Sequence, residues 1–316
     1  MIHIIVNPGG ASGRTMDYFR KKILPLFSGA DYEIHFSSQS DSLTQIASRL
    51  TDSSSRKESF VNLAVVGGDG TLNEVLNGIQ DFEHTRVGLI PSGSGNDLAR
   101  GLELPSDPGE IVKRILREET LRQMDVGQTI LHDRDVSMLF AVSSGIGFDA
   151  QVCHMASDDS VKGVLHKIGQ GKLIYLREAV KLILSWESAP AQITYERREG
   201  ETKDVVRVQD ELVFAAGMNH KYEGGGFMLC PKAEADDGKL DLCVVHNLSK
   251  TEFFRFFLGA FKGKHVKHKE CVTQARRRSV RIQAQRPLWV HVDGETRYTS
   301  VDAQFRTAEV RLNLMV

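Results

Sequence analysis

The sequence predicts an α/β domain with a mostly parallel sheet, followed by a second domain that is a β-rich sandwich. Short apolar runs alternate with helix-like segments up to about residue 122, and strand-like runs dominate after it. A chain of 316 residues is also long enough for two separate cores. We therefore predict domains at 1–124 and 125–316, with the linker near residues 122–129.

The first domain is predicted from alternating element types. Apolar runs such as IHIIV and FVNLAVV are typical of buried strands, and the segments between them have helical spacing. Strand–helix–strand units of this kind imply parallel pairing. The predicted strands are 2–6, 32–36, 60–66 and 87–91, and the predicted helices are 17–27 and 41–50.

The second domain is predicted from closely spaced strand-like runs. Two helical segments interrupt them, near 171–187 and 249–263. Such a pattern is typical of a sandwich. The predicted strands are 138–145, 192–196, 205–208, 211–218, 239–245, 279–284, 288–292 and 308–314.

Composition excludes several classes of protein. A net charge of −1 gives no reason to expect a nucleic-acid partner. The four cysteines form no C-x-x-C pair, which argues against zinc or disulfide frameworks and favours a reducing compartment. The N-terminus MIHIIVNPGG lacks a signal-peptide pattern, and no uncharged apolar run of about 18 residues is present. We therefore expect a cytoplasmic protein.

The segment VVGGDGTLNEVLNGI, residues 65–79, places four small or acidic residues directly after an apolar strand. Thr71 and Glu74 have capping-box spacing, so a helix is predicted to open at Thr71. A helix N-terminus presents N–H donors and a positive dipole end, and glycines let a phosphate approach the backbone. An ordinary turn between a strand and a helix remains the alternative.

A second turn of the same kind favours the phosphate-binding interpretation. In GLIPSGSGNDLAR, residues 88–100, glycines and a serine again join a strand to a helix, and NPGGASGR (7–14) follows the first strand. Loops at the carboxyl ends of neighbouring parallel strands meet in one crevice. Neither G-x-G-x-x-G nor G-x-x-x-x-G-K-[ST] is present, so we expect a nucleotide site of another design.

Six motifs follow one another along the chain: NPGGASGR, VVGGDGTLNEVLNGI, GLIPSGSGNDLAR, GIGFDAQV (145–152), YEGGGFMLCPKAEADDGKLDL (222–242) and LWVHVDGE (288–295). Together they give a specific resemblance. The chain resembles the diacylglycerol kinase catalytic family, in particular soluble bacterial lipid kinases related to sphingosine kinases. The resemblance implies a Rossmann-like domain of the NAD-kinase and diacylglycerol-kinase type, a β-sandwich domain, and a last strand that returns to the first domain. It also implies transfer of the ATP γ-phosphate to a lipid hydroxyl, such as that of diacylglycerol.

The resemblance also assigns residues to ATP and Mg²⁺. Asp69, Asp97 and Asp237 match an acidic network around magnesium, and the backbone carbonyls of Glu234 and Lys239 match its partners. This assignment suits a hard cation that prefers oxygen ligands. The expected nucleotide-binding residues are Asn7, Gly67, Gly68, Asp69, Gly70, Thr71, Glu74, Ser94, Gly95 and Asn96.

Two further positions are expected to act on the lipid. The resemblance makes Asp293 in VDGE the base that accepts the hydroxyl proton, with Glu295 in support, although a plain β-turn also fits. Asp149 in GIGFDAQV matches a contact to the polar head of the lipid, and it fits a helix cap equally well.

A lipid substrate raises the question of membrane docking. The apolar helical stripes in 172–186 and 253–261 fit either a core or a lipid-tail pocket. The basic segments 262–269 and 276–281 fit either a solvated edge or a peripheral membrane contact. A kinase of a soluble acceptor such as NAD and a non-catalytic nucleotide-binding regulator are the alternative functions, and the sequence leaves a homodimer open.

Overall fold

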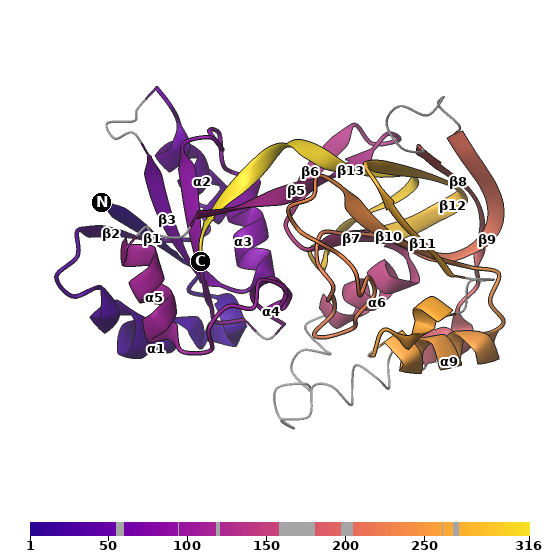
Figure 1. Ribbon diagram of the computed structural model, residues 1–316, viewed down its shortest axis with the longest axis horizontal. Helices are drawn as coiled ribbons and strands as arrows, with labels where there is room; N and C mark the ends of the chain where they lie inside the picture. The colour runs from indigo at the N-terminus through magenta and orange to yellow at the C-terminus, as the bar shows by residue number, and fades with distance from the viewer. Residues whose placement is uncertain are drawn as a thin grey trace. The chain divides into compact units, whose positions relative to one another are not determined.

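The computed structural model describes residues 1–54, 60–93, 95–117, 121–157, 181–196, 205–260, 262–267 and 272–316 (Figure 1). They form two compact units. Unit 1 comprises Met1–Val126, Ala235–Asp237 and Ala308–Val316, and unit 2 comprises Gly127–Glu234 and Gly238–Thr307. No helix among these residues is long and apolar enough to cross a membrane.

Unit 1 is built on a sheet with strand order β13-β4-β3-β1-β2. All these neighbours pair in parallel, and β13 contributes only its C-terminal end. Val6 lies opposite Val66, and Gly67 lies opposite Pro91, so the loops after three strands leave from one edge. The strands complete within this unit are β1 (Ile2–Val6), β2 (Tyr32–Phe36), β3 (Val61–Gly67) and β4 (Thr85–Pro91).

Helices cover both faces of this sheet. Every residue of β3 is buried, as expected for a parallel strand between two helical layers. One face packs Ile4, Ala64 and Ile90 against Ile111 and Ile115 of α5. The α-helices of unit 1 are α1 (Thr15–Tyr18), α2 (Leu43–Thr51), α3 (Asp69–Leu76), α4 (Asp97–Gly101) and α5 (Pro108–Arg117).

The single helix predicted for 17–27 is wrong. After α1 the chain forms a π-helical turn at Phe19–Ile23 and then a 3₁₀ turn at Leu24–Phe27. Pro25 explains the change, because proline lacks the N–H that an α-helix interior needs and its ring clashes with the preceding turn. The apolar spacing is nevertheless used, since Phe19, Ile23 and Phe27 are fully buried.

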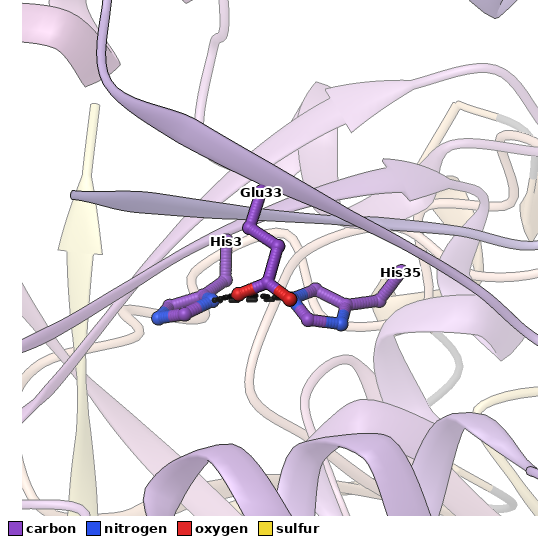
Figure 2. Close-up of side chains that lie close together, drawn as sticks. All are labelled: His3, Glu33 and His35. Atoms are coloured by element: carbon purple, nitrogen blue, oxygen red, sulfur yellow. Dashed lines mark hydrogen bonds and ion pairs between the residues drawn. The ribbon is translucent and has the colours of Figure 1, made fainter.

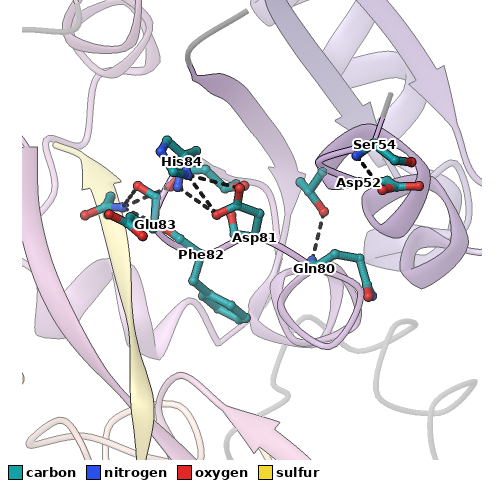
Figure 3. A network of polar contacts seen from close by, with 10 residues as sticks. Asp52, Ser54, Gln80, Asp81, Phe82, Glu83 and His84 are labelled. Atoms are coloured by element: carbon teal, nitrogen blue, oxygen red, sulfur yellow. Dashed lines mark hydrogen bonds and ion pairs between the residues drawn. The ribbon is translucent and has the colours of Figure 1, made fainter. Parts of the chain in front are cut away.

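The end of β13 is fixed in unit 1 by the segment before β4 (Figure 3). The Nδ2 atom of Asn313 donates to the carbonyl oxygens of Phe82 (2.9 Å) and Thr85 (3.2 Å). Within this segment, Nδ1 of His84 lies 3.1 and 3.0 Å from the two carboxylate oxygens of Asp81. The last strand of the chain therefore completes the sheet of the first unit.

Unit 2 is strand-rich, and its described strand pairs are antiparallel. Parallel pairing is thus confined to unit 1 and does not describe the sheet as a whole. The strand β5 runs through the expected linker at 122–129 without a break. The strands are β5 (Leu121–Leu131), β6 (Val136–Phe140), β7 (Ser143–Gly147), β8 (Ala189–Glu196), β9 (Val205–Met218), β10 (Leu240–His246), β11 (Val272–Arg277), β12 (Ser279–Val292) and β13 (Glu295–Met315).

Several predicted boundaries in unit 2 are wrong. The run 138–145 belongs to two strands, because the chain bends between Phe140 and Ser143. The predicted strand pairs 205–208 and 211–218, and 279–284 and 288–292, are single long strands. In β12 the interruption is a register shift between Gln283 and Leu288, which is a local irregularity and not an end.

Two helices of unit 2 contribute to a hydrophobic core of that unit. In α6 (Phe148–Ser157) and α9 (Lys250–Ala260), Phe148, Phe253 and Phe256 are buried. Residues 181–185 are helical, whereas 172–180 of the predicted stripe lie outside the described residues, as do 268 and 269 of the first basic segment. Of the described cysteines, Cys153, Cys230 and Cys243 are free thiols.

Candidate active site

The two glycine-rich turns of unit 1 touch each other. They follow β3 and β4, which are hydrogen-bonded neighbours, and the backbone N–H of Ser92 donates to the carbonyl of Gly67 (2.9 Å). A Cβ built on Gly68 would lie 3.1 Å from Gly93 Cα, and one on Gly93 would lie 2.7 Å from Gly68 Cα. A side chain at position 93 would therefore clash with the main chain of the first turn, and one at position 68 would be tighter than an ordinary contact.

The helix after the first turn begins differently from the prediction. The N-cap of α3 is Gly68, which makes no side-chain cap, so the predicted capping box of Thr71 and Glu74 is wrong. Thr71 is instead buried against Gly67, where a Cβ would lie 2.3 Å from that of Thr71. The Glu74 backbone carbonyl accepts a hydrogen bond from Thr44 Oγ1 (2.9 Å), which joins α3 to α2.

Asp69 links the two turns. Its carboxylate oxygens accept the backbone N–H groups of Asp97 (2.9 Å) and Leu98 (3.1 Å) at the start of α4. The carboxylate thus caps a helix that lies 28 residues further along the chain. Asp97 is buried and forms an ion pair with Arg100, whose Nη2 also donates to the Gly95 carbonyl (3.1 Å).

The second turn is closed by Asn96. This residue has φ +49°, in the left-handed region that asparagine tolerates. Its side chain accepts from the Gly93 N–H (3.0 Å) and donates to the Gly93 carbonyl (2.9 Å). Gly95 lies in the same turn, whereas Ser94 lies outside the described residues. Asn96 therefore shapes the turn through its own side chain.

The remaining predicted nucleotide residues lie at the same edge of the sheet. Asn7 directly follows β1, and its Oδ1 accepts the N–H of Gly9 (3.0 Å). Gly70 lies in the first turn of α3. Because β1, β3 and β4 end together, Asn7 and the two glycine turns form one group of loops.

The predicted metal segment near Asp237 is attached to unit 1 by polar contacts. Asp125, on β5, donates its N–H to the carbonyl of Ala235 (2.6 Å) and pairs with Arg311 of β13 (3.0 Å). Asp237 belongs to unit 1, whereas Glu234 and Lys239 belong to unit 2.

Asp293 lies in a two-residue hairpin turn between β12 and β13. Asp293 and Gly294 have φ +49° and +84°, the values that favour Asp-Gly in such turns. Its carboxylate, mostly buried, accepts N–H groups from Ala141 (2.8 Å), Val142 (2.8 Å) and Ser143 (3.0 Å). These donors orient the carboxylate. Glu295, its predicted support, is exposed at the start of β13.

Two residues from this hairpin, His291 and Asp293, have different partners. The ring of His291 is fully buried, and its Nε2 lies 3.2 Å from Asp149 Oδ2 and 2.9 Å from Glu223 Oε1. Gly145 makes room for this network, since a Cβ there would lie 2.0 Å from Asp149 Oδ2. Asp149 also accepts the N–H of Ala150 (2.7 Å) at the start of α6. Asp149 therefore lies inside the first turn of α6 and is not its N-cap residue, and its contact with the polar head of the lipid stays a prediction.

Burial and charge shift the pKa values of this network. Burial raises the pKa of Asp149, and the hydrogen bond from His291 opposes that shift. Burial lowers the pKa of His291, but the charge of Glu223 and the hydrogen bonds to both carboxylates outweigh it, so its pKa is well above the ordinary value. Burial raises the pKa of Cys153 to about 12, so this thiol is protonated at neutral pH.

Glu223→Gln is expected to reduce the loss of stability above pH ~6.5. With a raised pKa, His291 keeps a proton in the folded state that the unfolded chain has released. Its contribution is complete below the unfolded pKa and is lost as pH rises through the folded pKa, with a slope of at most about 1.4 kcal/mol per pH unit. Removing the charge of Glu223 lowers that folded pKa.

Urea unfolding from pH 6 to 9, together with NMR titration of the His291 ring, measures this effect. Glu211→Gln is the control, because Glu211 is an exposed acid of unit 2 on β9. Equal slopes for wild type and Glu223→Gln would contradict the assigned coupling.

An apolar pocket in unit 2 opens beside this network. Its empty volume is about 550 Å³, part of which is open to solvent, and Asp149 and Glu223 are the acids in its lining. Six phenylalanines from α6, α9 and neighbouring segments dominate the remaining wall. The lining residues are Phe148, Asp149, Val152, Cys153, Phe214, Glu223, Gly224, Phe227, Leu229, Phe253, Phe256, Phe257 and Ala260.

Sequence reasoning missed Glu223 and His291. Glu223 stands directly before the glycine run of YEGGGF, and His291 stands two residues before Asp293. Both residues lie inside motifs that the sequence analysis identified. The available signals were an acid next to a glycine run for Glu223 and a histidine within an apolar strand for His291. Their contact joins positions that are far apart in the chain.

The comparisons with known proteins agree with this organisation. The diacylglycerol kinase catalytic domain matches residues 1–129, and the YegS C-terminal NAD kinase beta sandwich-like domain matches residues 141–315. The fold and its glycine turns therefore define a kinase with an NAD-kinase-like architecture. The chain belongs to the diacylglycerol kinase family of lipid kinases, which confirms the resemblance drawn from its motifs.

Individual relatives give the same result. The diacylglycerol kinase of Staphylococcus carnosus is 28% identical over 257 residues, which are 80% of this chain and 76% of the relative. The diacylglycerol kinase of Mycobacterium tuberculosis is 27% identical over 231 residues, which are 73% of this chain and 69% of the relative. A crystal structure of a diacylglycerol kinase from Bacillus anthracis has a TM-score of 0.68 at 22% identity. The match covers 99% of this chain and 96% of that chain. An NAD kinase from Archaeoglobus fulgidus in complex with ATP shares the fold, with a TM-score of 0.50 at 10% identity, covering 100% and 94%.

Proposed function

We propose that this protein transfers the γ-phosphate of ATP to the hydroxyl of a lipid such as diacylglycerol, giving a phospholipid such as phosphatidate. The observation that carries the proposal is the pocket of unit 2, whose wall is aromatic and whose polar groups are Asp149 and Glu223. An apolar wall with few polar groups suits a molecule with one hydroxyl end and a hydrocarbon body. A soluble acceptor such as NAD, or a regulator without catalysis, is less well supported.

In this proposal the first unit is a Rossmann-like nucleotide domain, predicted at 1–124 and completed by Ala235–Asp237 and Ala308–Val316, and the rest of 125–316 forms the lipid domain. The parallel strands support the first assignment. Backbone N–H groups of the two glycine turns bind the phosphates, with Asn7, Gly70 and Gly95 beside them. Glycines at these turns let the phosphates approach the main chain, and α3 directs its N-terminus toward the same loops.

The acidic residues of the proposed metal site have a suitable donor chemistry. Asp69, Asp97 and Asp237 offer carboxylate oxygens, and Glu234 and Lys239 offer backbone carbonyls, which are the donors that Mg²⁺ prefers. When bound, Mg²⁺ neutralises phosphate charge during transfer. Asp69 is also occupied with the N–H groups of α4, so its proposed effect is to hold the two turns in register.

On the lipid side, Asp293 accepts the proton of the attacking hydroxyl and Asp149 binds the polar head. The fixed orientation of the Asp293 carboxylate supports the first role. The position of Asp149 in the pocket wall supports the second. The side chain of Glu295 is exposed, and in this proposal it supports Asp293 through its negative charge.

The proposal includes peripheral binding of the protein to a membrane surface. ATP is a cytoplasmic phosphoryl donor and the acceptor is a membrane lipid, so a cytoplasmic protein that docks peripherally meets both. A homodimer is not needed, because every residue that we assign belongs to one chain. Docking through basic residues predicts binding that rises with anionic lipid and falls with salt.

Transfer of labelled phosphate from ATP tests the function directly. The protein is offered diacylglycerol, other lipids with a free hydroxyl, and NAD, with the lipids in mixed detergent micelles. We expect labelled lipid and no labelled NAD. Label only in NAD would favour the soluble-acceptor alternative, and tight ATP binding without any transfer would favour the regulator.

Val152→Trp is expected to raise the KM for a long-chain lipid by about tenfold or more, because the indole fills the acyl-chain space. Val152 lines the pocket and is only partly buried, so the larger side chain can be accommodated. Gln151→Trp, at the neighbouring position of α6 and outside the lining, is the matched control. An unchanged KM in Val152→Trp, with the fold intact, would remove this pocket from the proposal.

A further inference from the structure

Three side chains converge at the β1–β2 edge of unit 1, away from the loops described above. Figure 2 shows the imidazoles of His3 and His35 turned toward each other, with the carboxylate of Glu33 between them. His3 Nδ1 lies 3.1 Å from His35 Nε2. Glu33 Oε2 lies 3.6 Å from the first of these nitrogens and 3.8 Å from the second. One atom from each residue therefore forms a small triangle.

The strand register explains the convergence. His3 is the pairing partner of Glu33 in the parallel β1–β2 ladder, so the two side chains leave the same face of the sheet. His35 stands two residues after Glu33 and shares that face because side chains alternate along a strand. The cluster is therefore built into two hydrogen-bonded strands.

The environment fits a semi-enclosed site. The side chains of His3 and His35 are 13% and 12% exposed, whereas Glu33 is 57% exposed and can adjust its position. Arg49 is the cation that acts on His35, and it donates to both carboxylate oxygens of Asp41 (3.2 and 2.9 Å). A cation that enters between the histidines would therefore contact the carboxylate of Glu33. The positive charge of Arg49, which lies nearby, is balanced by Asp41.

The spacing matches the coordination geometry of zinc. Ligands bound at about 2.0–2.1 Å in a tetrahedron lie roughly 3.3 Å from one another. The three distances in the cluster are within about half an ångström of that value. A hydrogen bond between the two rings accounts for the shortest contact, but it does not account for a carboxylate directed at both nitrogens.

We propose that His3, Glu33 and His35 form a binding site for a divalent transition-metal ion of the zinc class. Two imidazoles and one carboxylate are ligands that such ions prefer, whereas Mg²⁺ prefers oxygen alone. The fourth position is left to water. The site is separate from the proposed Mg²⁺ residues and does not depend on the kinase proposal.

A second cluster, Cys153 with Glu223 and His291, has similar spacing but less suitable chemistry. Its thiol is protonated at neutral pH, and the His291 Nε2 atom already contacts two carboxylates. We therefore assign the tighter zinc site to β1 and β2. A metal there would join the β2 strand to β1 and so stabilise the folded form of unit 1.

Titration calorimetry of the tag-free, chelator-treated full chain with ZnCl₂ tests the site. We expect one equivalent to bind, and His3→Gln and His35→Gln each to weaken this event by more than about tenfold, since even outer-shell partners commonly contribute that much. Zinc should raise the Tm of wild type and not of these variants. MgCl₂ at the same concentration should give neither effect.

Two controls keep the test decisive. His84→Gln removes a histidine of unit 1 that pairs with one carboxylate and, among the described residues, belongs to no such triangle, so zinc affinity should be unchanged. Glu33→Gln removes the exposed ligand with little effect on the core and should weaken zinc binding. This variant therefore still tests the site if either histidine variant fails to fold. Absence of zinc binding in wild type, or equal affinity in wild type and Glu33→Gln, would overturn the proposal.

Discussion

Asp293→Asn is expected to reduce kcat for lipid phosphorylation by roughly 10²–10⁴-fold, the usual contribution of a general base. ATP affinity should stay unchanged, because the glycine turns belong to the other unit. An amide cannot accept the proton of the attacking hydroxyl. Steady-state kinetics with lipid micelles and calorimetry with ATP measure the two quantities separately.

The structure also gives Asp293 a role in folding, so a matched control is needed. Its carboxylate accepts three backbone N–H groups, and an asparagine would turn an NH₂ group toward one of them. Asp135 has the same residue type and the same left-handed backbone (φ +52°) in the β5–β6 hairpin, but it is exposed. Asp135→Asn should leave kcat and Tm unchanged.

The pH dependence distinguishes the two roles of Asp293. A lost base removes the acid limb of the kcat profile, whereas a disturbed hairpin lowers Tm and leaves the shape of that profile intact. A variant with full kcat would remove Asp293 from the mechanism. A variant with reduced kcat, reduced Tm and an unaltered profile would assign it to the turn alone.

Much of unit 1 could be predicted from local sequence. Apolar runs followed by glycine and then a helical pattern identify where a buried parallel strand ends, as at Gly67 and Pro91. The long strands of unit 2 were harder to predict, because polar residues such as Gln209 and Asp210 interrupt β9 in sequence without ending it. Pairing with β8 keeps that strand extended, and pairing is a tertiary property.

The candidate site shows the same division. Family motifs identify Asp149 and Asp293, but the partners that fix them come from distant positions, such as Ser143, which lies 150 residues before Asp293. Gly145 shows what local reasoning cannot reach. Its φ is not in the left-handed region, and it must be glycine because the side chains of Asp149 and His291 pack against it.

Gly93→Ala is expected to weaken ATP binding by roughly 5- to 150-fold, which corresponds to an overpacking cost of about 1–3 kcal/mol. The new methyl group would lie 2.7 Å from Gly68 Cα and 2.9 Å from Asn96 Oδ1. Gly68 is backbone at the N-cap of α3 and cannot rotate away, so the two turns must separate. Calorimetry with ATP and Mg²⁺ measures the loss.

Gly95→Ala separates crowding within the protein from crowding against the nucleotide. Its Cβ would make only ordinary contacts, at 3.4 Å to Asp69 and 3.6 Å to Asp97, so the fold should be unaffected. If phosphates lie against this turn, the methyl group still reduces ATP affinity while Tm stays constant. Gly109→Ala, in the first turn of α5, controls for the general effect of removing a glycine. Full ATP affinity in both Gly93→Ala and Gly95→Ala would show that the phosphates bind elsewhere, because neither turn could then be in contact with them.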